Sequence, residues 1–520
     1  MIINHHHLED KIYCSVKVVA YMETDTFSCN CETIAKEIDR LTDATDGDGL
    51  KDYVLQIELA VSSNALVTNG AIFYYLGTAF DTLSCWENDS QGGQESTFSV
   101  EYKKKALFYL RKSIDLFEAD KKQKHLLLCA YTNYANALDS CCRVIEALRI
   151  YRKAIQLHPA FGMAWGNYGR ALQFYANTVN DTGHRSELHC YAYQAIKYAL
   201  DLQDPNIHAT AHAYFTKILE NYNATGQKDL LEASIVFKPY SMGSGEELMY
   251  REWCLSNHFF LNPLNDLIEQ ESAFAHDPLV ITRCSEQETA TPNGVHTGVE
   301  PPKYLAMLNQ LKEEYVYARF LVFEGTERSK EVHYADKNVR ITLSSYDYAN
   351  YSIRLEQIKS AFKILFSIID QVAFAINSYW SLGYGERQAS ADKVFNSKKY
   401  PKDNIALSAL LWSYREFSDN FCKSETGSER DLKTLRNALE HKYVKVHEYP
   451  DNRKLQMEDD DFYHISEVDL TTYALRLLKI SREFIMEFTY AIGIEEDKTD
   501  ITGKTVLPLI VADFDDEWKV

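Results

Sequence analysis

A chain of 520 residues, 46% of them hydrophobic, is long enough for more than one domain and apolar enough for buried cores. Its formal net charge of −20 excludes indiscriminate nucleic-acid binding, which needs a basic surface, but leaves room for a local basic patch. No apolar run reaches the roughly 18 residues of a membrane span, and no basic segment precedes an apolar stretch at the N-terminus. We therefore expect no membrane segment and no signal peptide.

The cysteine and histidine pattern predicts neither disulfides nor a metal site. The 11 cysteines are odd in number and lack CxxC pairs, which is typical of reduced thiols in a cytoplasmic protein. Cys29 and Cys31, and the run His5 to His7, contain metal-ligating residue types, but no second pair stands at zinc spacing. We expect no metal and no cofactor.

Residues 1–235 contain a helical pattern that repeats about every 34 residues. Its clearest copy has two predicted helices and is followed by a second copy. A third copy, from Phe73 to Ser113 with Gly77 at a small position, precedes them and is interrupted by a polar insertion. The marked positions of the first two copies are Tyr131, Tyr134, Ala135, Leu138, Ala147, Tyr151, Ala154 and Pro159, then Trp165, Tyr168, Gly169 and Leu172. Small residues in such a pattern let the two helices approach, and large residues fill the seam to the next pair.

This pattern resembles the tetratricopeptide (TPR) repeat at its eight marked positions. The resemblance implies a solenoid of helix pairs whose concave groove binds a protein or peptide partner. The alternative is a plain scaffold for the C-terminal part of the chain. The sequence names no ligand for the groove.

Residues 236–345 are predicted to be a linker and packing region. Phe237 to Tyr240 and Met242 to Gly245 mark its start, because Pro and Gly interrupt the helical pattern. The aromatic, Asn-rich stretch from Tyr250 to Asp266 predicts an Asn-Pro turn with side-chain-to-backbone bonds. Residues 286–302 read as a mobile loop, 304–320 as a helix and 321–343 as a short hairpin.

Residues 346–520 contain four predicted helices, which complete an all-α fold. The patterns cover residues 353–380, 405–417, 429–447 and 468–492, and residues 506–511 form a candidate late strand. Asp370 lies inside the apolar run of the first helix, where an unpaired carboxylate would be costly. We therefore expect Asp370 to have a cationic or hydrogen-bonding partner.

The third helix carries the residues that best fit a reaction. Leu432, Leu435 and Leu439 make one apolar stripe, and His441 falls about 140° from its centre on an ideal helix. Arg436 lies at the edge of the stripe, and Asn437 lies opposite it. Other Arg/His pairs of similar spacing are Arg152/His158, Arg251/His258 and Arg328/His333. Context favours Arg436/His441, because this pair lies on a helix of an all-helical block.

A four-helix block with Arg-Asn-x3-His on its third helix resembles a HEPN domain. The order of TPR-like array, aromatic linker and bundle is similar to a prokaryotic TPR-containing HEPN branch. The resemblance implies a metal-independent endoribonuclease that dimerises through this domain, cleaves cellular RNA, typically tRNA, and acts in toxin–antitoxin or anti-phage defence.

By the same resemblance, Arg436 and His441 are catalytic, Asn437 lies beside them, and Asp370 orients Arg436. Further basic residues are expected to bind RNA phosphates: Lys442, Lys445 and His447 on the same helix, and Lys398 and Lys399 in a basic loop. The chemistry is compatible, since His titrates near neutrality and Arg offers a bidentate donor to phosphate. One His cannot serve as base and acid in one step, which a second subunit would resolve.

Two other interpretations remain open. The chain can be a non-catalytic TPR adaptor whose bundle only dimerises, with a stable protein partner and no RNA cleavage. A metal-dependent nuclease using Asp370 and Glu440 is disfavoured, because no carboxylate trio stands at convincing spacing.

Overall fold

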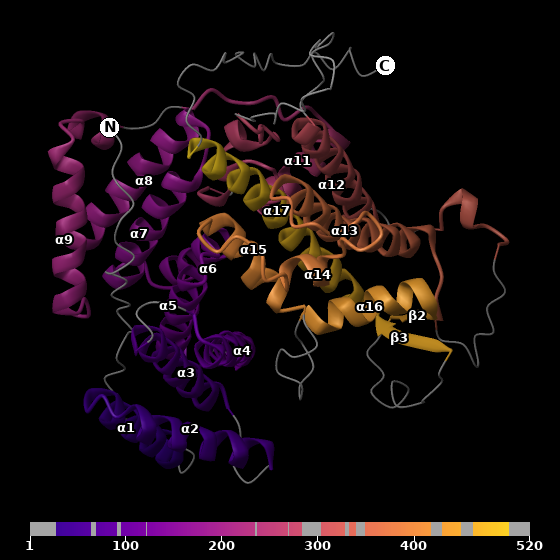
Figure 1. Ribbon diagram of the computed structural model, residues 1–520. Helices are drawn as coiled ribbons and strands as arrows, with labels where there is room; N and C mark the ends of the chain where they lie inside the picture. Colours follow the sequence, from indigo (N-terminus) through magenta and orange to yellow (C-terminus); the bar gives the residue numbers. More distant parts are fainter. Residues whose placement is uncertain are drawn as a thin grey trace. The chain divides into compact units, whose positions relative to one another are not determined.

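A computed structural model describes residues 28–63, 69–90, 95–120, 122–233, 237–268, 270–282, 303–327, 332–339, 349–417, 429–448 and 461–498. The chain divides into two compact units. Figure 1 labels their helices and strands. The N-terminal unit comprises Met1–Asn177, His184–Phe237 and Leu411–Lys433; the C-terminal unit comprises Thr178–Gly183, Lys238–Leu410 and Thr434–Val520. The candidate strand at 506–511, the proposed loop at 286–302 and His5 to His7 lie outside the described residues.

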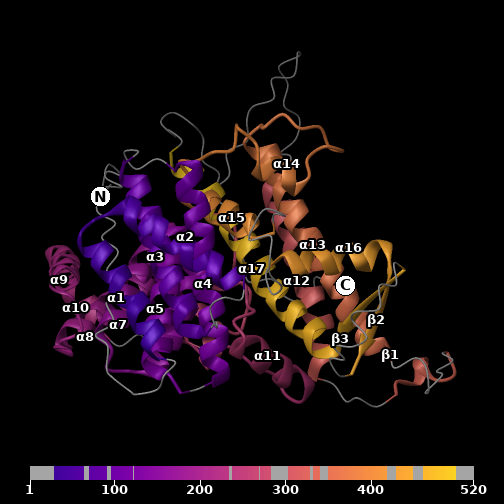
Figure 2. The ribbon, with the colours of Figure 1, turned by 90° about the horizontal axis from the view of Figure 1, so that it is seen from below.

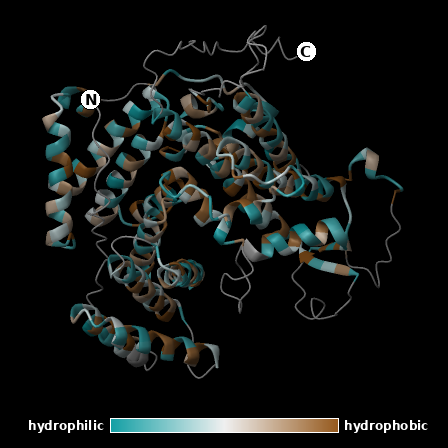
Figure 3. Ribbon diagram, viewed as in Figure 1, coloured by the Kyte–Doolittle hydropathy of each residue, from teal (hydrophilic) through white to brown (hydrophobic). Residues whose placement is uncertain are grey.

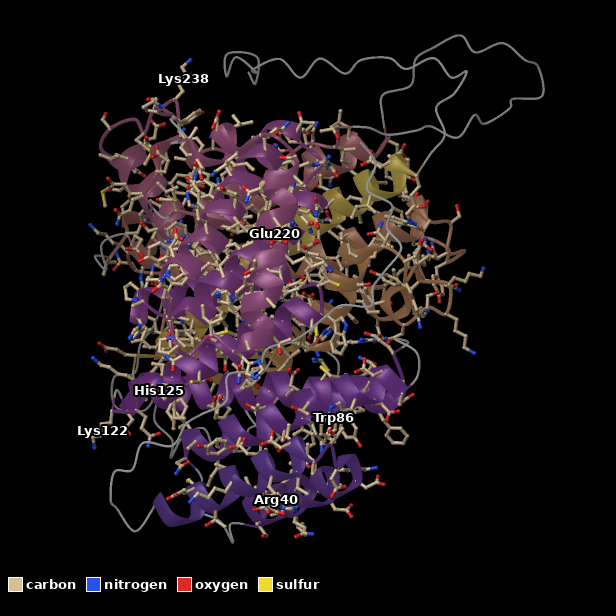
Figure 4. All side chains as sticks on the ribbon, turned by 90° about the vertical axis from the view of Figure 1, so that its left-hand side faces the viewer. Arg40, Trp86, Lys122, His125, Glu220 and Lys238 are labelled. Atoms are coloured by element: carbon tan, nitrogen blue, oxygen red, sulfur yellow. The ribbon has the colours of Figure 1, made fainter. Side chains whose placement is uncertain are left out.

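The N-terminal unit is a series of helices. They are α1 (Ser28–Asp43), α2 (Gly47–Ser62), α3 (Gly70–Ser90), α4 (Thr97–Asp120), α5 (Lys124–Ser140), α6 (Val144–Leu157), α7 (Gly162–Thr178), α8 (Thr182–Asp201), α9 (Ala209–Ala224) and α10 (Lys228–Glu232). Consecutive helices pack in pairs, α3 against α4 and α5 against α6, and α4 also packs against α5. Charged residues such as Arg40 and Lys122 point outward from this unit (Figure 4).

Small residues allow close helix approach where the repeat pattern predicted it. A Cβ on Gly169 of α7 would lie 2.5 Å from Cγ1 of Ile196 and 3.0 Å from the carbonyl oxygen of Ala192, both on α8. A Cβ on Gly77 of α3 would lie 2.9 Å from the backbone nitrogen of Leu110 on α4. Glycine is therefore required at the closest point of both helix pairs.

The C-terminal unit has a helical core with a small sheet at one edge. Its elements are α11 (Glu246–Ser256), η1 (Pro263–Asp266), η2 (Ser272–Phe274), α12 (Lys303–Glu327), η3 (Tyr334–Asp336), β1 (Ala349–Asn350), α13 (Ile353–Tyr379), α14 (Ala391–Phe395), α15 (Ile405–Arg415), α16 (Glu429–His441), β2 (Tyr443–His447), β3 (Phe462–Ser466) and α17 (Glu467–Asp497). The two-unit division places residues 411–433, at the end of α15 and the start of α16, with the N-terminal unit.

Helices α12, α13 and α17 form the core of this unit by packing against one another. Ser481 of α17 donates to the carbonyl of Leu365 on α13 at 3.0 Å, and Arg354 of α13 donates to the carbonyl of Gly325 on α12 at 2.8 Å. By length and composition α13 could cross a membrane, but more than half of its apolar stretch is buried in this core. Apolar and polar residues are interleaved along the helices (Figure 3).

Two buried arginines connect the described residues of the predicted linker and packing region to the core of this unit. Arg482 of α17 donates to the carbonyls of Phe260 and Asn262 and pairs with Asp266 at 2.9 Å, with both charged side chains fully buried. The Asn-Pro turn forms as predicted, since the backbone N–H of Leu264 donates to Oδ1 of Asn262 at 3.0 Å. The described residues around the Asn-Pro turn therefore pack in the same unit as the bundle.

A second buried ion pair joins the predicted linker and packing region to α12. Arg319 pairs with Asp277 at 2.8 Å and donates to the carbonyl of Phe259. Burial raises the pKa of the Asp277 carboxyl, but the Arg319 guanidinium outweighs burial and holds the pKa below its usual range. Asp277 is thus held as a carboxylate inside the unit.

Two of the predicted secondary-structure elements were wrong. Residues 321–327 continue helix α12, and residues 332–339 contain a short 3-10 turn, so the predicted hairpin at 321–343 does not form among its described residues. Helix α16 ends at His441, and residues 443–447, which were predicted to continue this helix, form strand β2. The alternation of Val444 and Val446 with polar residues favours a strand, because β-branched side chains fit a pleated surface.

Candidate active site

Helix α16 turns its leucines inward and its polar motif outward. Leu432 and Leu435 are fully buried and Ala438 is 4% exposed, so this face packs on the unit as the apolar spacing predicted. Asn437 and Glu440 are exposed, and Arg436 is half-buried at the border of that face. The functional groups of α16 therefore reach solvent while its backbone is fixed by packing.

The guanidinium of Arg436 is held by three neighbours. Its Nε lies 3.2 Å from Oε1 of Glu440, one helical turn later, and its Nη1 donates to Oδ1 of Asn437 at 3.1 Å. The group also lies over the ring of Phe366 on α13, 5.5 Å from the ring centroid. With 31% of the Arg436 side chain exposed, the guanidinium is oriented and still accessible to a phosphate.

His441 is the last residue of α16 and its side chain is 72% exposed. Its Nε2 lies 3.7 Å from Oε2 of Glu440, the carboxylate that also pairs with Arg436. One carboxylate therefore faces both motif residues, although they lie far apart around an ideal helix. The helix ends here because the N–H of Lys442 completes its last turn to Ala438, and the N–H of Tyr443 pairs with Asp461.

The chain passes directly from His441 into a small sheet beside α16 (Figure 2). Strand β2 pairs with β3 in parallel register, Tyr443 with Phe462 and Lys445 with His464, and with β1 in antiparallel register. Lys445 and His447 thus lie on a strand rather than on the motif helix. They remain near the motif in sequence, while Lys442 is exposed between the two elements.

The expectation that Asp370 orients Arg436 is wrong for the described residues, because Asp370 has a different partner. Its Oδ1 accepts the backbone N–H of Ala391 at 3.0 Å, the first N–H of α14, so Asp370 caps that helix. The N–H of Ala391 is therefore the hydrogen-bonding partner that was expected for the half-buried carboxylate of Asp370. The orienting contacts to Arg436 come from Glu440 and Asn437 instead.

Lys398 and Lys399 lie in the exposed turn after α14. No contact of the described residues joins them to α16, so their predicted role in phosphate binding stays a prediction. The other Arg/His pairs have structural roles where they are described. Nδ1 of His258 lies 2.6 Å from the carbonyl of Asn265 inside the Asn-Pro turn, and His158 ends helix α6.

Two residues of this site were not predicted, Glu440 as an orienting group and Phe366 as the ring beneath Arg436. Glu440 is i+4 from Arg436, a spacing that favours an ion pair on a helix, so the sequence carried a usable signal. Phe366 is on α13 and lies near Arg436 only in the folded structure, which spacing along one helix does not reveal.

The described residues contain no group of three or more His, Cys, Asp or Glu side chains able to hold a metal ion. The arrangement on α16 provides a charge-stabilising cation, an imidazole for proton transfer and a carboxylate that faces both. These are groups that can act on a phosphodiester.

Residues 295–495 match the family model described as LA2681-like HEPN, and this range includes both Arg436 and His441. The chain therefore has an all-α fold with a HEPN domain in its C-terminal part. Members of the HEPN superfamily are usually ribonucleases. No curated protein and no solved structure matched the chain. The matched range begins before residue 346 and includes α12, in agreement with the packing of α12 in the same unit as the bundle.

Proposed function

We propose that the chain is a metal-independent endoribonuclease whose reaction is carried by Arg436 and His441. The single observation that most supports this is the shared carboxylate of Glu440, which lies 3.2 Å from Nε of Arg436 and 3.7 Å from Nε2 of His441 at the exposed end of α16. The pair lies inside the range that matches a HEPN family model. The proposed location is the cytoplasm.

The proposed reaction is attack by the ribose 2′-OH on the adjacent phosphorus. The 2′-oxygen forms a bond to phosphorus as its proton passes to a base, and the bond from phosphorus to the 5′-oxygen breaks as that oxygen takes up a proton. Arg436 neutralises the charge that builds on the non-bridging oxygens. The products are a 2′,3′-cyclic phosphate and a 5′-OH, and all atoms of the RNA are retained.

We further propose that two copies of the chain form the complete site. A single imidazole would have to remove one proton and deliver another in the same step. A second subunit that brings its own His441 to the same phosphodiester divides these tasks between two groups. The exposure of His441, 72% in the single chain, is compatible with such an assembly.

The helical array of the N-terminal unit is proposed to be a TPR-like partner-binding region. Glycines lie at its closest helix crossings, and large side chains such as Tyr134 and Tyr151 fill its buried seams. A protein or peptide bound there would control an RNase that acts on tRNA in toxin–antitoxin or anti-phage defence.

The test is to incubate the purified full chain with RNA in excess EDTA and to compare it with His441→Ala and Arg436→Ala. We expect cleavage by the wild type and a loss of roughly 100-fold to 10,000-fold in each variant. His212→Ala is the matched control, because His212 is also exposed on a helix but lies in the N-terminal unit. This control is expected to cleave at the wild-type rate.

Equal cleavage by the wild type and both site variants would overturn the assignment. Loss of cleavage in EDTA would point instead to a metal-dependent reaction. No cleavage under any condition, together with a stable protein partner, would make the chain a non-catalytic adaptor.

A further inference from the structure

The outer face of β2 and β3 carries a row of rings that the proposed reaction does not use. Alternation along each strand separates two faces: Val446 and Ile465 are buried on the inner face, while Tyr443, Lys445, His447, Phe462 and His464 share the outer face. Tyr443 is exposed, at 72%, and the other four are half-buried. We call these five residues the ring ladder.

Each member of the ring ladder contacts its neighbour. The rings of Tyr443 and Phe462 lie 5.7 Å apart, those of Phe462 and His464 lie 6.5 Å apart, and those of His464 and His447 lie 5.1 Å apart and nearly parallel. Nζ of Lys445 lies 4.1 Å from the centre of the Phe462 ring. The result is a continuous aromatic surface with a cation on it.

The chemistry of this surface fits unpaired nucleobases. Bases stack on aromatic side chains whatever their sequence, whereas bases in a duplex are already stacked and cannot reach such a surface. Lys445 adds a charge that attracts the phosphate backbone. Tyr and Phe are also enriched in protein interfaces, but lysine is depleted there, so the cation among the rings favours RNA over a protein partner.

The ladder starts two residues after His441. The N–H of Lys442 still belongs to the last turn of α16, and Tyr443 is the first residue of β2, so the strand is fixed directly to the end of the motif helix. Lys359 of α13 also donates to the carbonyl of Val444 at 3.4 Å, which anchors the inner face of β2 to the core. The ladder is thus a rigid extension of the motif rather than a loop.

We propose that the ring ladder binds the unpaired bases of single-stranded RNA next to the scissile phosphodiester. Tyr443 and Phe462 stack on bases, and Lys445 pairs with the backbone. This inference rests on the proposed nuclease function and assigns its substrate class as single-stranded RNA or an exposed loop.

The test uses the full chain and a short, fluorescently labelled 2′-O-methyl oligouridine, which cannot be cleaved by 2′-OH attack. Fluorescence anisotropy is expected to show tighter binding to this single strand than to a blunt duplex of the same length. Tyr443→Ala and Phe462→Ala are each expected to weaken single-strand binding by between about 5-fold and 100-fold. Tyr443→Phe and Phe462→Tyr keep a ring and are expected to retain binding.

Tyr334→Ala is the matched control, since Tyr334 is a 79% exposed tyrosine of the same unit outside the ladder, and it is expected to bind like the wild type. Unchanged affinity in Tyr443→Ala, or equal binding of duplex, would overturn the inference. Tyr443→Ala could instead lower the molecular mass measured by light scattering relative to the wild type and leave the RNA affinity unchanged. That result would assign the face to contact with a second copy of the chain.

The two proposals can fail separately. Ring-dependent binding without any cleavage of ordinary RNA would support the ladder and contradict the nuclease. RNA cleavage that is lost in His441→Ala, together with single-strand affinity that is unchanged in Tyr443→Ala, would support the nuclease and contradict the ladder.

Discussion

Glu440 has two carboxylate oxygens, and each faces a different residue of the motif. Oε1 lies 3.2 Å from Nε of Arg436, and Oε2 lies 3.7 Å from Nε2 of His441. A carboxylate in this position orients the guanidinium and places a negative charge beside the imidazole. We therefore treat Glu440 as a positioning residue.

Replacement of Glu440 by glutamine keeps the shape of the side chain and removes its charge. We expect kcat for RNA cleavage to fall between about 10-fold and 100-fold, because the two motif groups lose their common anchor. The melting temperature is expected to stay unchanged, since an exposed pair contributes little to stability. A rise in activity would contradict this role and would mean that Glu440 masks Arg436 in the wild type.

At the scale of single residues, the sequence predicted exposure better than contacts. The positions of Arg436, Asn437 and His441 around the helix followed from the leucine stripe, and the structure has them at the predicted border or outside it. Asp370 was assigned to Arg436 through the resemblance to HEPN domains, and its place in an apolar run separately predicted a partner. Its partner is the N–H of Ala391, a backbone group that residue types do not reveal.

At the scale of elements, helices with strong apolar periodicity were predictable and the sheet was not. Residues 353–380 and 468–492 were expected as helices and appear as α13, Ile353–Tyr379, and α17, Glu467–Asp497. Strand β2 was missed because its partner β3 begins only at Phe462, and pairing between separate segments leaves little trace in local spacing. The missed strand is the one that carries the ring ladder.

The Arg482–Asp266 pair gives an element-scale prediction, because it joins α17 to the Asn-Pro turn with both side chains fully buried. Arg482→Met leaves a buried carboxylate and two carbonyls without their donor, and we expect a loss of about 3–5 kcal/mol in the free energy of unfolding. Denaturant unfolding followed by circular dichroism measures this loss.

The control for Arg482→Met is Lys498→Met, which breaks the exposed pair with Asp403 and is expected to cost less than about 1 kcal/mol. Similar losses for the two variants would contradict the claim that the buried pair holds the region 238–345 to the bundle.

At the scale of the whole molecule, one buried acid sets an expected pH dependence of stability. Burial, then the neighbouring Glu483 and Asp266, raise the pKa of Glu487 well above its usual range. The folded protein therefore keeps a proton on Glu487 that the unfolded chain releases above about pH 4.3. The contribution of this residue to stability is full below that pH and falls as the pH rises toward the folded pKa.

Glu487→Gln imitates the protonated side chain at every pH. We expect the variant to melt at a higher temperature than the wild type near pH 8, with a smaller difference near about pH 5, because protonation then costs less. Thermal unfolding at both pH values measures the two differences. A difference that grows as the pH falls would contradict the assigned direction of the shift.

The central claim is that Arg436 and His441 cleave RNA without a metal. The most direct measurement is expression of the full chain and of His441→Ala in cells, with the ends of cellular RNA fragments mapped. We predict growth arrest and fragments that end in 2′,3′-cyclic phosphate and begin with 5′-OH in the wild type, and neither effect in the variant. Fragments with 5′-phosphate ends, or the same fragments from His441→Ala, would contradict the account.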